Sequence, residues 1–239
     1  MQHKTLLILT LAGVCPLALS VQPTLTAQQL ERAMREGAAM NTPSSGYNLR
    51  DYLLREYNSG VSLTPRAGEV DAVTVATPYE RVRYHSYLES LQQSPMNVAK
   101  AREVLRQYQG RVTFVVFAHS PFTVDAETEQ FMQAYGSTST RGERGETRTR
   151  SFLDRYKPAT LSLGGRTYTA RPVADGPYTD IFSILGSRPE SRYLGLLSYS
   201  FDLSRLGTRE SIGGRGVLRF RDSQGQTEYR LEVDLAKYF

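Results

Sequence analysis

The stretch Arg111–His119 constrains the fold more than any other part of this sequence. Its residues, RVTFVVFAH, place apolar side chains at both even and odd positions. A strand with this pattern has two apolar faces, and both need cover. We therefore expect a central strand here, with other structure packed on each side of it.

Helix signals dominate the chain before this strand. Thr26 and Gln29 have the spacing of a capping box, which predicts a helix over about 27–40. Asn48 offers a second cap, and the apolar spacing after it predicts a helix that runs through Tyr57. The two helices are expected to be joined by a polar loop.

A strand and a helical hairpin are expected next. The β-branched alternation of Val70–Ala76 predicts a strand. Thr77-Pro78-Tyr79-Glu80 then supplies a capping hydroxyl, a proline at the first helical position and a glutamate at the third. Ser94-Pro95 repeats the start signal, and Gly110 ends the second helix. The sequence thus predicts a helical hairpin over 78–109.

The chain after the central strand changes character. Asp125 is expected to cap a short helix, and 136–150 reads as a polar loop. Gly164-Gly165 predicts a tight hairpin turn between two strands. The remaining expected elements are a turn over Pro172–Pro177, strands over Tyr178–Leu185 and Arg192–Leu203, and a closing hairpin of Val217–Arg221 and Glu228–Leu235.

This order predicts an α+β fold, with a helical N-terminal half followed by an antiparallel β-sandwich or an open-barrel-like C-terminal half. The expected organisation has three parts. Residues 1–20 form a signal peptide, and residues 21–66 form an N-terminal helical segment. Residues 67–239 form a mixed α/β domain that holds the helical hairpin 78–109 and the β-rich region 158–239.

The first twenty residues have the order of a cleavable secretory signal. Lys4 precedes an apolar run from Leu6 to Val14, and Ala18-Leu19-Ser20 offers a small-residue cleavage site. The run is shorter than the roughly 20 residues that a membrane-spanning helix needs. We expect cleavage after Ser20 and release of residues 21–239 to the periplasm or the outside of a bacterial cell, with no transmembrane segment in the mature chain.

Cys15 is the single cysteine of the chain. It offers an alternative as a lipidated residue, but Val14 before it and Pro16 after it depart from a lipobox. If it leaves with the signal, the mature domain has no disulfide, no thiol nucleophile and no cysteine-bound metal. Removal of the signal also leaves 28 basic against 24 acidic residues, a mild excess for a nucleic-acid binder.

His119 is the candidate catalytic residue, because it stands where the central strand ends and Ser120 follows. His85 is the other histidine beyond the signal, and the pair lacks the spacing of a metal site. A histidine that bonds strand-end carbonyls is the favoured interpretation. A base paired with a distant carboxylate is the alternative, and no metal or cofactor is expected.

Other catalytic signatures are weak. The sequence has no Gly-x-Ser-x-Gly elbow and no Ser-x-x-Lys dyad. Asp175, Asp180 and Asp202 are carboxylate candidates by position alone, and solvated turn residues are the simpler interpretation. The glycines around Gly213–Gly216 lack the helix and the Lys-Ser/Thr pair of a phosphate loop.

Three functional hypotheses follow. The leading one is an exported, non-enzymatic domain that binds an unidentified protein or a cell-envelope component through its sandwich faces or loops. The second is an exported hydrolase that uses His119 with a distant carboxylate. The third is weak polyanion contact by the region 136–157, whose basic residues are Arg141, Arg144, Arg148, Arg150, Arg155 and Lys157.

Overall fold

The computed structural model describes residues 25–42, 47–58, 62–64, 67–108, 110–136, 151–203 and 214–235. The expected signal peptide with Cys15, the loop after residue 136 up to residue 150, and Gly213 lie outside these residues. The predictions made for them therefore stay predictions.

The described chain has an α+β architecture, as expected, with strands in two sheets. The six-stranded sheet has the order β1-β3-β4-β8-β7-β2, and the four-stranded sheet has the order β10-β9-β5-β6. The pairs are antiparallel except β2 with β7, which is parallel. The strands are β1 (Leu53–Glu56), β2 (Ser62–Leu63), β3 (Val70–Ala76), β4 (Arg111–Thr123), β5 (Ala159–Leu163), β6 (Arg166–Ala170), β7 (Pro172–Ile184), β8 (Glu190–Asp202), β9 (Arg215–Arg221) and β10 (Glu228–Asp234).

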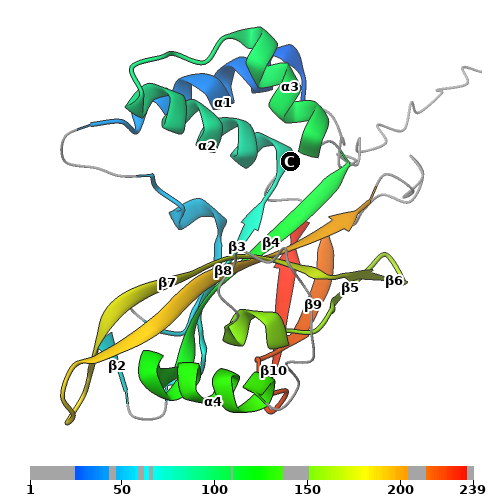
Figure 1. Cartoon of the computed structure of the whole chain (residues 1–239). Helices are drawn as coiled ribbons and strands as arrows, with labels where there is room; N and C mark the ends of the chain where they lie inside the picture. Colours follow the sequence, from blue (N-terminus) through cyan, green and yellow to red (C-terminus); the bar gives the residue numbers. More distant parts are fainter. Residues whose placement is uncertain are drawn as a thin grey trace, which may run out of the picture.

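Four α-helices are assigned in the described residues: α1 (Ala27–Ala39), α2 (Pro78–Leu91), α3 (Val98–Tyr108) and α4 (Val124–Gly136). Figure 1 shows α1, α2 and α3 together at one end of the molecule and α4 at the other. The helices are thus not confined to the N-terminal half, because α4 follows the central strand and strands β1 to β3 lie between α1 and α2. Two short 3-10 helices, Arg50–Tyr52 and Phe152–Arg155, complete the elements.

The central position expected for Arg111–His119 is confirmed. Strand β4 lies between β3 and β8, and its residues Val112 to Val116 are all buried. The largest apolar cluster draws side chains from both sheets, including Phe114, Leu197 and Leu218. A second, smaller cluster lies among α1, α2 and α3 and includes Leu30, Val82 and Val104.

Several local predictions are confirmed. Thr26 and Gln29 form a capping box at α1, and Thr77 caps α2 with Pro78 in its first turn. Gly164 and Gly165 have φ angles of 57° and 74° in the β5–β6 turn, the left-handed values that such a turn requires. The hairpin of β9 and β10 forms in the expected place.

The predicted helix from Asn48 to Tyr57 is wrong. The chain makes one 3-10 turn over Arg50–Tyr52 and continues as β1, which pairs with β3. The side chain of Tyr52 is buried, and the Arg83 guanidinium lies 4.6 Å from the centre of its ring. The apolar residues of this stretch therefore pair in the sheet and pack on α2 instead of forming a helix. Tertiary contacts often override local propensity in this way.

Three other local predictions also need correction. Pro172–Pro177 is part of strand β7, with one extra residue between Asp175 and Tyr178 opposite β8. Proline is tolerated at such a bulge because its missing N–H breaks no regular pair. Helix α3 begins at Val98 instead of Ser94-Pro95, and the Asn97 side chain accepts the Lys100 N–H at its start. α4 is expected from Asp125, but the Thr123 hydroxyl accepts from the Ala126 N–H.

Candidate functional site

His119 lies within β4, which continues past the expected strand end to Thr123, and a carboxylate does lie beside the His119 ring. The Nδ1 atom of its ring is 2.7 Å from Oδ1 of Asp71, a residue of β3. Asp71 is the extra residue of a bulge, because Val70 lies opposite Ala118 while Ala72 lies opposite Phe117. The bulge gives Asp71 a position that regular pairing would not, as bulges near functional residues often do.

Asn58 completes this polar group from the residues that follow β1. Its side-chain Nδ2 lies 2.9 Å from Oδ1 of Asp71, 3.0 Å from the Gly68 carbonyl and 3.1 Å from the Val70 carbonyl. Backbone N–H groups of Tyr57 and Asn58 both donate to the Asp71 carbonyl. The side chains of His119, Asp71 and Asn58 are therefore held by three separate segments of the chain.

The ring of His119 is almost inaccessible. Its side chain is 1% exposed, and the Phe182 ring lies 5.2 Å from it, centre to centre. In the described part of the chain, Asp71 is the side chain that hydrogen-bonds this ring, and no hydroxyl group does so. A ring that is buried to this extent is not accessible to a substrate, as general-base catalysis requires.

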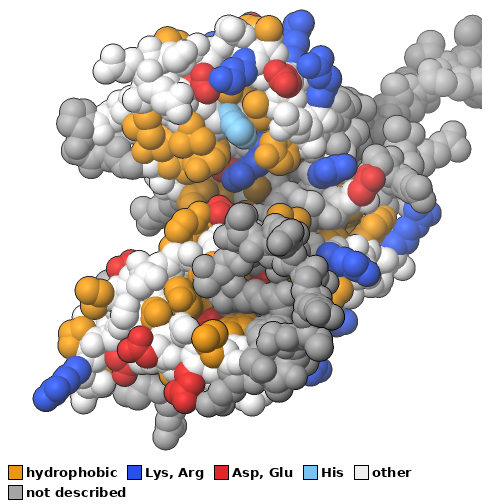
Figure 2. Space-filling view, viewed as in Figure 1, with side chains coloured by type: hydrophobic (Ala, Val, Ile, Leu, Met, Phe, Trp, Pro, Cys, Tyr) orange, Lys and Arg blue, Asp and Glu red, His pale blue; other side chains and the backbone are white. Residues whose placement is uncertain are grey.

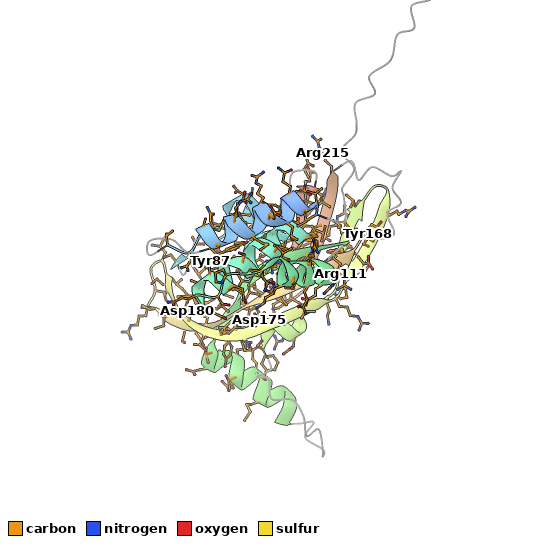
Figure 3. All side chains as sticks on the ribbon, turned by 90° about the horizontal axis from the view of Figure 1, so that it is seen from above. Tyr87, Arg111, Tyr168, Asp175, Asp180 and Arg215 are labelled. Carbon is orange, nitrogen blue, oxygen red and sulfur yellow. The ribbon has the colours of Figure 1, made fainter. Side chains whose placement is uncertain are left out.

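The other expected candidates lie elsewhere. Figure 3 shows Asp175 and Asp180 along β7. The Tyr178 hydroxyl donates a hydrogen bond to Oδ1 of Asp175 at 2.7 Å. Asp202 is exposed at the end of β8. Ser120 is buried, and its hydroxyl accepts the Phe122 N–H. None of these groups is among the contacts of His119, and the described residues hold no cluster of three metal-ligating side chains.

Glu69 forms a second buried polar group beside the first. Its backbone carbonyl accepts the His119 N–H, and its carboxylate accepts the Ser223 N–H and hydroxyl, both at 2.8 Å. The Tyr156 hydroxyl donates to it at 3.2 Å. Burial raises the pKa of Glu69, and the Ser223 donors act in the opposite direction. Neighbouring Asp222 caps the β9–β10 turn by accepting two backbone N–H groups.

A groove of about 860 Å³ runs beside Asn58 between the two sheets. Its walls come from β1, from β10 and from Thr64, Ala67, Gly68 and Val70. Strand β1 is the last strand of one sheet and β10 the last strand of the other. No described strand pairs with the outer edge of either one, so both edges carry backbone groups that are free to bind an added strand.

Aromatic and charged side chains line this groove. The rings of Tyr57 and Tyr229 meet edge to face at 5.2 Å, and the Arg55 guanidinium lies 5.8 Å from the Tyr57 ring centre. Tyr229 is buried, and burial raises its pKa to about 12. A Cβ atom on Gly68 would lie 2.9 Å from the Tyr229 hydroxyl, so glycine lets this hydroxyl approach the backbone. The other lining residues include Thr64, Glu228, Arg230 and Glu232.

Sequence reasoning singled out His119 but missed Asp71, Asn58 and the groove. A signal for Asp71 existed, since it is the one charged residue within the apolar run of β3. No local signal could identify the groove, because its two walls are about 170 residues apart in the chain. Comparisons of the chain with protein-family models, with curated proteins and with solved structures find no match.

Proposed function

We propose that residues 21–239 form an exported, non-catalytic binding domain that takes up an extended polypeptide segment of an envelope partner in the groove between β1 and β10. The observation that carries this proposal is that two sheet edges with which no described strand pairs border one groove. Edge strands bind extended peptides through main-chain hydrogen bonds, and side pockets give specificity. In this proposal the two sheets act as a sandwich that is open along this side.

The side chains of the groove fit such a ligand. Tyr57 is 40% exposed and offers a ring for an apolar side chain of the peptide. The walls carry Arg55 and Arg230 as well as Glu228 and Glu232, so charges of both signs are available to set the register of the bound peptide. A groove of mixed charge with exposed edges suits a peptide better than a small apolar ligand.

Site-specific photocrosslinking in producing cells tests this proposal. A benzophenone side chain at position 55 should give a discrete adduct with one protein, and the same group at the exposed position Arg188 should not. The Tyr57→Ser variant should weaken the adduct, and a synthetic peptide from the crosslinked segment should bind the purified mature domain. Equal adducts from both positions, or a peptide that binds Tyr57→Ser as well as the parent, would contradict the proposal.

Export is a separate part of the proposal, and it rests on the order of Lys4, the apolar run and Ala18-Leu19-Ser20. Among the described residues, no helix is both long and apolar enough to cross a membrane. The intact mass of the protein recovered from the periplasm or the medium should match a chain that begins at Val21. A lipid-modified chain that begins at Cys15 would contradict this cleavage site.

The 2.7 Å contact between His119 and Asp71 supports a second candidate, an exported hydrolase. It requires the ring to become accessible, which Phe182 opposes. Turnover of a generic ester, peptide or glycoside by the purified mature chain, lost in His119→Ala but kept in His85→Ala, would favour the hydrolase over the binding domain. Absence of turnover in the parent would remove this candidate.

A further inference from the structure

The outer face of the four-stranded sheet carries one row of residues that crosses all four strands. Arg230 of β10 lies opposite Arg219 of β9. Arg219 lies opposite Thr160 of β5 on its other side. Thr160 lies opposite Thr169 of β6. The row therefore consists of two adjacent arginines followed by two adjacent threonines.

These four side chains point away from the core. Their neighbours along each strand, Leu231, Leu218, Leu161 and Ala170, are all buried. Side chains alternate between the two faces of a strand, so the row lies on the opposite, solvent side. Arg219, Arg230 and Thr169 are exposed, and Thr160 is partly exposed. Adjacent strands are about 4.8 Å apart, so the row is about 14 Å long.

The arginine pair is not explained by the stability of the sheet. Like charges directly opposite each other on neighbouring strands are unfavourable. Arg230 has an acidic neighbour in Glu232, at 4.0 Å and largely in solvent. The guanidinium of Arg219 has no hydrogen-bond or ion-pair partner among the described residues. Two arginines side by side have unused N–H donors in the planar arrangement that suits phosphate and sulfate groups.

We propose that this row binds an anionic polysaccharide, with an acidic group on Arg219 and Arg230 and sugar hydroxyl groups on Thr160 and Thr169. The neutral, hydroxyl-bearing half of the row matches a sugar backbone. The outer-face positions of these strands carry no aromatic side chain on which a nucleic-acid base could stack. Glu228 and Glu232 on β10 confine the positive charge to a short stretch, which disfavours duplex DNA.

This surface shares Arg230 with the peptide groove but extends away from it across β9, β5 and β6. Arg219 does not line the groove, although Arg230 borders it. Figure 3 shows Arg215 at the start of β9 and Tyr168 on β6, away from Asp175 and Asp180 on β7. In Figure 2 several Lys and Arg side chains lie at the end of the molecule where Figure 1 labels β5 and β6. Variants at Arg219 therefore test the row without altering the groove.

Binding of the mature chain to a defined heparin oligosaccharide, measured by calorimetry at several salt concentrations, tests the proposal. Arg219→Gln should weaken binding about tenfold, since a hydrogen bond to a charged group contributes on the order of one tenfold step in affinity. The Arg219→Gln substitution should also reduce the salt dependence of heparin binding. Arg188→Gln removes the same charge from an exposed position outside the sheet and should change the affinity less than about twofold.

The threonines separate specific recognition from general charge attraction. Thr160→Val and Thr169→Val together should weaken heparin binding about threefold or more with no change in salt dependence, because they remove hydroxyl groups and no charge. Thermal unfolding checks that each variant is folded. The proposal is overturned if the parent does not bind heparin, or if Arg188→Gln equals Arg219→Gln. It is also overturned if a single-stranded DNA of equal charge or inorganic phosphate competes as well as the oligosaccharide.

Discussion

At the scale of single residues, two buried carboxylates, those of Glu69 and Glu127, accept hydrogen bonds from neutral donors. Glu69 is satisfied by a serine N–H, a serine hydroxyl and a tyrosine hydroxyl. Glu127 of α4 accepts the Phe152 N–H at 2.5 Å, and burial raises its pKa as well. Burial of this kind favours the protonated form of a carboxyl group, although the charge of nearby Arg155 lowers the pKa of Glu127 in part.

Glu69 should make stability depend on pH in a defined direction. Its pKa is raised above the ordinary value of 4.5 in the folded state. The folded state therefore binds the proton more tightly, and this contribution to stability is present below pH 4.5 and is lost as the pH rises through the raised pKa. In urea unfolding between pH 4 and 7.5, Glu69→Gln should gain stability relative to the parent as the pH rises.

Exposed Glu232 provides the matched control for this experiment, since its side chain is 84% exposed. The difference in unfolding free energy between Glu232→Gln and the parent should stay nearly constant over the same pH range. If Glu69→Gln also shows a constant difference, the carboxyl of Glu69 does not titrate differently in the folded and unfolded states, and the assigned direction is wrong.

At the scale of elements, α1 and α2 depend on a close approach at Gly37. A Cβ atom there would lie 2.0 Å from the Arg83 carbonyl oxygen in α2. Alanine is the better helix former by about 1 kcal/mol, but overpacking against a backbone atom costs about 1–3 kcal/mol. Gly37→Ala should therefore lower the free energy of unfolding, whereas exposed Arg35→Ala should be nearly neutral. A gain in stability for Gly37→Ala would contradict this packing.

Elements with local signals could be predicted, and elements defined by distant contacts could not. The caps at Thr26 and Thr77 and the Gly164-Gly165 turn satisfy backbone requirements within a few residues, so the sequence specifies them. Strand β1 has four residues and depends on pairing with β3. Its apolar spacing also fits a helix, so periodicity alone gave the wrong prediction.

In the candidate site too, features with a local signal could be predicted and features that depend on distant contacts could not. The strong apolar pattern of the central strand placed His119 at its end, but β4 continues past His119 to Thr123. Its partner Asp71 depends on a bulge, a one-residue change in register that no composition signal marks. The groove needs two sheet edges to meet, and the fold alone brings β1 and β10 together.

At the scale of the whole molecule, the described residues form one large apolar cluster and one small one. The large cluster joins both sheets, and the small one holds α1, α2 and α3 together. Tyr79 packs against both clusters. Figure 2 shows hydrophobic side chains at the surface of this helical layer, so its apolar residues are incompletely covered.

The helical layer should therefore open before the sheets do. Regions with few buried apolar contacts open at lower free energy than the rest of a fold. In native-state hydrogen exchange, amides of α1 and α3 should exchange at lower free energies than those of β4, β8 and β9. Val82→Ala, in the small cluster, should accelerate exchange in the helical layer alone. Leu218→Ala, in the large cluster, should accelerate it throughout, because the layer has no sheet support once the sheets unfold. Equal protection of helices and strands in the parent, with both variants affecting all amides alike, would instead mean that the two clusters unfold as one unit.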